Sequence, residues 1–179
     1  MTAQTHNFEA DTGKILNIVI NSLYSDPDIF LRELLSNASD AIHKRKFLGQ
    51  TEPSILNSGE NEIFVHVDEK KKTIKLVDTG IGLSADELIE TLGTIARSGT
   101  SSFLDSIDEA TDSKDAAKAL IGKFGVGFYS AFMVAEKVSV TTRKAGETDV
   151  SIWESDGQSG YTINQSENER EVGTSIILH

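Results

Sequence analysis

The stretch FLRELLSNASDA, from Phe30 to Ala41, decides both the fold and the place to look for a site. Its apolar residues recur every three or four positions, which predicts an amphipathic helix from about Ile29 to Leu48. At about 100° per residue, Glu33, Asn37 and Asp40 form one narrow stripe beside the apolar arc. Ordinary boundary residues and one wall of a binding site explain this stripe equally well.

The composition indicates one soluble domain with an acidic surface. The chain has 179 residues, 38% of them hydrophobic, which suits a sizeable core. Its 28 acidic and 17 basic residues give a net charge of −11, which disfavours nucleic acid as a partner. Cysteine is absent and the four histidines lack ligand spacing, so we expect any metal to be held mainly by oxygen.

The sequence has the features of neither a secreted nor a membrane-spanning protein. The N-terminus lacks the basic start and apolar core of a signal peptide. No apolar run approaches the length that spans a membrane. We therefore expect a cytoplasmic protein without a membrane partner.

Helical and strand patterns come in blocks along the chain. Helices are expected at residues 14–24 and Ala85–Leu92, and a hairpin at residues 63–78. Further strands are expected in KVSVTTR, DVSIWES, GYTINQ and VGTSIILH. Because the blocks do not alternate strictly, we predict an α+β fold. The specific expectation is a two-layer α/β sandwich, whose largely antiparallel mixed sheet is covered on one face by helices.

Asp78 is the second candidate site residue. It ends a strand on the face of Ile74 and Leu76, so its carboxylate is expected to be buried and to need a donor. The glycines that follow, Gly80 and Gly82, permit close approach of a ligand. A tight turn after the strand would also explain them.

Two more segments have suggestive patterns. In GKFGVGF, residues 122–128, glycines precede VGFYSAFMVA, for which we expect a helix, and backbone N–H groups at such a start bind phosphate. The pattern is neither a dinucleotide fingerprint nor a P-loop. Thr174 is the polar member of an otherwise apolar strand face. Its hydroxyl could share a ligand or water with Asp78, and an edge strand would explain it equally well.

Together these segments resemble the ATP-binding domain of the ninety-kilodalton heat-shock chaperone family, a branch of the GHKL ATPases. The resemblance covers nearly the whole chain through SLYSDPDIFLRELLSNASDA, VDTGIGLS, LGTIARSGT, GKFGVGFYSAFMVAEKV and GTSIILH. It implies a single N-terminal ATP-binding domain at residues 1–179, with a mobile lid at about residues 93–127. The family's middle and C-terminal domains are expected to be absent from this chain.

The resemblance also implies roles for single residues. Glu33 is implied to be the hydrolytic base, which Arg32 would help to hold ionised, and Asn37 is implied to be the Mg²⁺ ligand. Asp78 is implied to accept a hydrogen bond from the adenine amine. The other nucleotide-binding positions that the family implies are Asp40, Ala41, Gly82, Leu83, Arg97, Phe124, Gly125, Val126, Gly127 and Thr174.

The implied cofactors are ATP or ADP with Mg²⁺, and hydrolysis is expected to be weak in the isolated domain. The implied partners are client proteins, co-chaperones, a second copy of the full-length protein, and inhibitors of the ansamycin and resorcylic lactone classes. The isolated domain is expected to be monomeric. Two other functions stay open: the ATP domain of a sensor histidine kinase, and a GHKL module that senses nucleotide without appreciable hydrolysis. His43, followed by Lys-Arg-Lys, lacks the context of a kinase phosphoacceptor.

Overall fold

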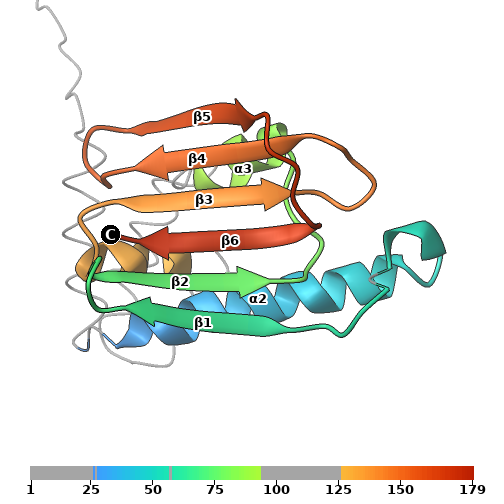
Figure 1. Cartoon of the computed structure of the whole chain (residues 1–179), viewed down its shortest axis with the longest axis horizontal. Coiled ribbons are helices and arrows are strands. Elements are labelled where there is room, and N and C mark those ends of the chain that lie inside the picture. Colours follow the sequence, from blue (N-terminus) through green and yellow to red (C-terminus); the bar gives the residue numbers. More distant parts are fainter. Residues whose placement is uncertain (1–25, 27, 57, 94–125) are drawn as a thin grey trace, which may run out of the picture.

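One six-stranded sheet is the framework of the protein, seen here in a computed structural model that describes residues 26, 28–56, 58–93 and 126–179. Its strand order is β1-β2-β6-β3-β4-β5 (Figure 1). The strands are β1 (Ile63–Asp68), β2 (Thr73–Asp78), β3 (Val138–Arg143), β4 (Val150–Ser155), β5 (Tyr161–Ser166) and β6 (Gly173–Leu178). Every pairing among these strands is antiparallel, so the predicted mixture with parallel pairs is not found in the described part of the chain.

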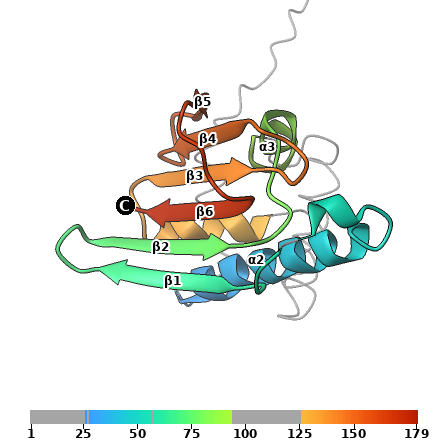
Figure 2. The same ribbon diagram turned by 45° about the vertical axis from the view of Figure 1, so that its right-hand side comes forward.

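Helices form a second layer on one face of this sheet (Figures 1 and 2). The layer consists of α2 (Ile29–Leu48), α3 (Ala85–Leu92) and the 3₁₀ helix η2 (Val126–Met133), while the short 3₁₀ helix η1 (Pro53–Ile55) follows α2. This arrangement confirms the predicted α+β sandwich. The predicted helix at residues 14–24 and almost all of the predicted lid lie outside the described residues.

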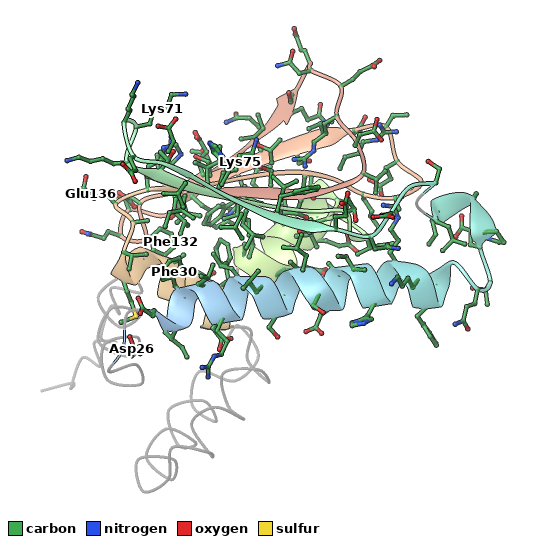
Figure 3. All side chains as sticks on the ribbon, turned by 60° about the horizontal axis from the view of Figure 1, so that its bottom comes forward. Asp26, Phe30, Lys71, Lys75, Phe132 and Glu136 are labelled. Atoms are coloured by element: carbon green, nitrogen blue, oxygen red, sulfur yellow. The ribbon has the colours of Figure 1, made fainter. Side chains whose placement is uncertain are left out.

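The core forms where α2 meets the sheet. Phe30, Leu34, Ala38 and Ile42 recur at four-residue spacing and are all buried, as the helical pattern predicts. Leu34 packs in one cluster with Leu76 of β2, which is 2% exposed. Figure 3 shows α2 running beneath the sheet, with Phe30 close to the labelled Phe132 of η2. The apolar arc therefore fixes which side of α2 faces the sheet.

The segment VGFYSAFMVA contains the expected helix, and residues Val126–Met133 adopt the 3₁₀ form rather than the α form. The Ser130 hydroxyl donates to the carbonyl of Gly127, three residues earlier, at 2.6 Å. The Tyr129 hydroxyl donates to the Leu92 carbonyl at the end of α3, which ties η2 to another element. The Ser130 bond uses a carbonyl three residues back, so it competes with the regular α-helical pattern and favours the tighter turn.

Candidate functional site

A row of polar side chains crosses four strands on the face that the helices cover. The register pairs Asp78 with Thr174, Thr174 with Thr142, and Thr142 with Ser151. These four side chains are all buried, with exposed fractions of 4%, 8%, 0% and 3%. The next row along the same strands is apolar and belongs to the core: Leu76, Ile176, Val140 and Trp153. The polar row thus borders the main apolar core.

Thr174 lies in the middle of the sheet, because β6 is flanked by β2 and β3. The edge-strand explanation of its hydroxyl is therefore wrong. Its register partner is Asp78, the carboxylate of the row. The predicted proximity of these two residues is confirmed.

Asp78 is a buried acid with a backbone donor, as its strand parity predicts. The Gly80 N–H donates to Asp78 Oδ1 at 2.8 Å. Burial raises the pKa of Asp78 to about 6, although hydrogen bonds from the backbone of Gly80 and Thr174 and the charge of Arg170 act to lower it. At neutral pH the carboxyl is mostly ionised and presents an acceptor in a poorly hydrated place.

The loop after β2 brings Asp78 to helix α2. A Cβ built on Gly80 would lie 2.6 Å from the Ala41 Cβ and 2.7 Å from Asp78 Oδ1. The Ile81 N–H donates to the Ala41 carbonyl at 3.1 Å. Ala41 and Asp78, two predicted pocket residues from different elements, therefore lie on either side of one glycine.

The same loop continues against the end of β3. Gly82 has a φ of 69°, and a Cβ there would lie 2.0 Å from the Arg143 carbonyl oxygen, so no other residue fits without moving the strand. The Leu83 N–H donates to Thr142 Oγ1 at 2.9 Å. These contacts place Gly82 and Leu83 beside the polar row.

Arg45 fixes the back of this loop from α2. It is 6% exposed, and its Nε donates to the Ile55 carbonyl at 2.6 Å. Its Nη1 donates to the carbonyls of Thr79, at 2.8 Å, and Gly80, at 3.4 Å. One guanidinium thus joins the segment after α2 to the turn that carries the Asp78 donor.

Replacing Arg45 by Met is expected to destabilise the protein by about 2–4 kcal/mol, because buried carbonyls lose their charged donor. Urea denaturation followed by circular dichroism measures the change. Lys46→Met, at an exposed position of the same helical turn, is the matched control and should shift the free energy of unfolding by less than about 0.5 kcal/mol. Equal stabilities of the two variants would contradict the role given to Arg45.

Glu33 lies against the start of η2. A Cβ on Gly127 would lie 2.4 Å from Glu33 Oε2, so a larger residue there would make the Glu33 side chain move. Burial raises the pKa of Glu33, and the charge of Arg32 lowers it by less. The expectation that Arg32 keeps Glu33 ionised is thus right in direction, but burial outweighs it. The structure brings together Glu33 and Gly127, two residues predicted for the site from distant segments.

The other predicted residues have mixed outcomes. Asn37 and Asp40 lie on α2 with exposed side chains, so only Glu33 of the polar stripe is partly buried. Val126 is the first residue of η2, and its side chain lies outside the described part. The predictions for Arg97, Phe124 and Gly125 also lie outside the described residues.

Three buried residues near the site were missed by sequence reasoning: Thr142, Ser151 and Arg45. Thr142 had a usable signal, because it shares its strand parity with Val138 and Val140 in KVSVTTR. Thr174 was found by the same argument. Arg45 had a positional signal, because it lies seven residues after Ala38 on the apolar arc of α2, although arginine is usually exposed. Ser151 offered no comparable signal, since serine is usually exposed.

Among the described ranges, none of the helices combines the length and the hydrophobicity that a membrane span requires. In these ranges no three His, Asp or Glu side chains are grouped so that they could hold a metal ion alone.

Comparison with known proteins identifies the family. Residues 24–174 match the family described as histidine kinase-, DNA gyrase B-, and HSP90-like ATPase. The "Chaperone protein HtpG" of Rickettsia massiliae (strain Mtu5) and that of Rickettsia rickettsii (strain Sheila Smith) are each 53% identical over 180 residues, which cover 100% of this chain and 28% of each relative. The HtpG of Rickettsia bellii (strain OSU 85-389) is 49% identical with the same coverage. The chain thus spans 28% of the length of these curated relatives. The family match covers most of the chain, which therefore belongs to the histidine kinase-, DNA gyrase B- and HSP90-like ATPases.

Proposed function

We propose that this chain is the ATP-binding and ATP-hydrolysing domain of a molecular chaperone that assists the folding and maturation of client proteins. The observation that carries the proposal is the buried Asp78 carboxylate, which shares a row with Thr174 and adjoins α2 through Gly80. A buried, mostly ionised acceptor suits a ligand that offers a hydrogen-bond donor. The chaperone names of the relatives, which are longer proteins, support the wider role.

In this proposal Asp78 accepts a hydrogen bond from the exocyclic amine of adenine. Gly82 and Thr174 complete a contact through water, and Leu83 packs near the base. Guanine has a carbonyl where adenine has the amine, so an ionised Asp78 disfavours guanine. Asp40 and Ala41 border the nucleotide on the α2 side, where Ala41 adjoins the Asp78 loop.

The phosphates are proposed to lie near Glu33 and Gly127. Backbone N–H groups of Phe124, Gly125, Val126 and Gly127 would donate to them, with Arg97 nearby. Asn37, one helical turn from Glu33, would hold Mg²⁺ through its amide oxygen. A single protein ligand suits Mg²⁺, which usually takes its other ligands from water and phosphate. The described residues contain no group of three acidic side chains that could bind the ion without the nucleotide. Bound there, the ion supplies charge neutralisation of the phosphates.

Glu33 is proposed to accept a proton from the attacking water. Its raised pKa makes it a better base than an exposed glutamate, provided that it is ionised at the working pH. Its carboxylate lies against Gly127, and this position matters because phosphoryl transfer depends mainly on positioning and charge stabilisation. This position favours hydrolysis over a module that only senses nucleotide.

The family supports a proposal for the wider assembly. We propose that residues 93–127 close over ATP as a lid, and that a middle domain elsewhere in the full-length protein completes the hydrolytic site. The full-length protein is proposed to be a cytoplasmic homodimer that clamps on client proteins and works with co-chaperones. Ansamycin and resorcylic lactone inhibitors are proposed to compete with ATP for this pocket.

Calorimetric titration tests this function directly. With Mg²⁺ present, we expect saturable binding of ATP and ADP with a stoichiometry near one, and binding of GDP at least about ten times weaker because of the Asp78 acceptor. Phosphate release by the chain alone should be slow or unmeasurable. No binding of either adenine nucleotide would overturn the proposal.

A further inference from the structure

The Thr142 hydroxyl occupies the centre of the polar row and joins three segments. It accepts from the Leu83 N–H at 2.9 Å and lies 3.1 Å from the Gly173 carbonyl oxygen. It also lies 3.2 Å from Thr174 Oγ1. The side chain is completely buried, so water does not take the place of any of these partners.

Only one arrangement of hydrogens satisfies all three contacts of this hydroxyl. Thr142 has one hydrogen and two lone pairs, and the Gly173 carbonyl can only accept. The Thr142 hydrogen therefore goes to Gly173, and its lone pairs receive the Leu83 N–H and the Thr174 O–H. As a result, the Thr174 hydrogen is engaged with Thr142 and is not available to a ligand.

This arrangement leaves Thr174 with only acceptor lone pairs for other partners. Asp78, its register partner, is also an acceptor when ionised. The two residues together form an acceptor-only edge, which favours a ligand or bound water that donates and disfavours a carbonyl. A freely rotating Thr174 hydroxyl would accept both kinds of ligand.

We infer that Thr142 is a positioning residue for base specificity: it orders the Thr174 hydrogen and fixes the Leu83 backbone, so that the pocket prefers a 6-amino purine to a 6-oxo purine. This inference rests on the proposed function, because it concerns the same pocket. It adds a residue that need not touch the nucleotide. Thr142 acts through the Thr174 hydroxyl and the Leu83 loop, which are proposed to contact the nucleotide or its bound water.

The test compares ADP with IDP. At the 6-position the base of ADP has an amine and that of IDP a carbonyl, and N1 is an acceptor in ADP but carries a hydrogen in IDP. Calorimetry would measure both affinities, with Mg²⁺, for the unaltered chain, Thr142→Val and Thr142→Ser. We expect Thr142→Val to weaken ADP binding about tenfold and to lower the preference for ADP over IDP at least about fivefold. The freed Thr174 hydroxyl can then donate to the bound water, which can turn one of its own hydrogens towards the carbonyl. Thr142→Ser keeps the hydroxyl and should restore both values to within about twofold.

Ser151→Ala is the matched control, since it removes a buried hydroxyl from the same row one strand further away. It should leave the ADP to IDP ratio unchanged. If Thr142 had a purely structural role, Thr142→Val would weaken the binding of both nucleotides in parallel. An unchanged ratio in this variant therefore overturns the inference, while ADP binding by the unaltered chain still upholds the proposed function. If the unaltered chain does not bind ADP, both the inference and the proposed function are overturned.

A second variant covers the case in which Thr142→Val does not fold, as judged by circular dichroism. Thr174→Val removes the hydroxyl that Thr142 orders but leaves the Leu83 and Gly173 bonds of Thr142 in place. It should weaken ADP binding while changing IDP binding less, so that the ratio falls at least about threefold. An unchanged ratio in this variant would also overturn the inference.

Discussion

Asp78→Asn is expected to weaken ADP binding at least about 100-fold without harming the fold. The Gly80 N–H donates to Oδ1 of Asp78, and the amide oxygen of Asn would keep this bond. The amide nitrogen would then occupy the place of the other carboxylate oxygen. It would present a donor to the adenine amine, which is itself a donor, so the contact becomes unfavourable.

The stability of this variant provides an independent check. Burial raises the pKa of Asp78 from 3.8 to about 6, so the folded protein binds the carboxyl proton of Asp78 more tightly than the unfolded chain does. The ionised carboxylate therefore costs about 3 kcal/mol above pH 6, and this cost disappears as the pH falls towards 4. We expect Asp78→Asn to be more stable than the unaltered chain at pH 7.5, and by a smaller margin at pH 5.

Calorimetry and urea denaturation on the same samples separate the two effects. Asp149→Asn changes an exposed carboxylate between β3 and β4 and should leave both the ADP affinity and the stability almost unchanged. If Asp78→Asn binds ADP like the unaltered chain, Asp78 is not the adenine anchor. If it unfolds instead, the carboxylate has a structural role, as the acceptor of the backbone hydrogen bonds from Gly80 and Thr174.

Local periodicity explains why most of the fold was predictable from the sequence. The four-residue spacing of Phe30, Leu34, Ala38 and Ile42 determines the face of α2, and the predicted helix bounds agree with Ile29–Leu48. Strand parity likewise placed Asp78 and Thr174 on the covered face, because side chains alternate along any strand. These signals are carried by neighbouring residues and need no knowledge of distant contacts.

The features that sequence reasoning missed depend on contacts between distant segments. The position of β6 between β2 and β3 decides that Thr174 is central, but alternation alone does not determine strand order. Arg45 is buried because three carbonyls from two other segments meet it. The 3₁₀ form of η2 is accompanied by a Tyr129 bond to Leu92, far along the chain. No local pattern encodes such partners.

Glu33→Ala is expected to abolish ATP turnover in the full-length protein, by at least about 100-fold, while leaving ATP affinity within about threefold. The Glu33 carboxylate lies against Gly127, whereas the adenine ring is proposed to bind at the Asp78 end of the site. Removing Glu33 therefore removes the proton acceptor but few contacts with the nucleotide. A loss of rate without a loss of affinity is the signature of a group that acts in the transition state.

The pH dependence distinguishes a base from a residue that only shapes the site. A base must be ionised, so turnover should fall as the pH drops below the raised pKa of Glu33. The charge of Arg32 lowers that pKa, so Arg32→Ala should raise it and move the acid limb of the rate profile to higher pH. Glu136→Ala, at an exposed carboxylate after η2, should leave both the rate and its profile unchanged. Undiminished turnover in Glu33→Ala would remove Glu33 from the mechanism, and an unmoved acid limb in Arg32→Ala would mean that a different group titrates.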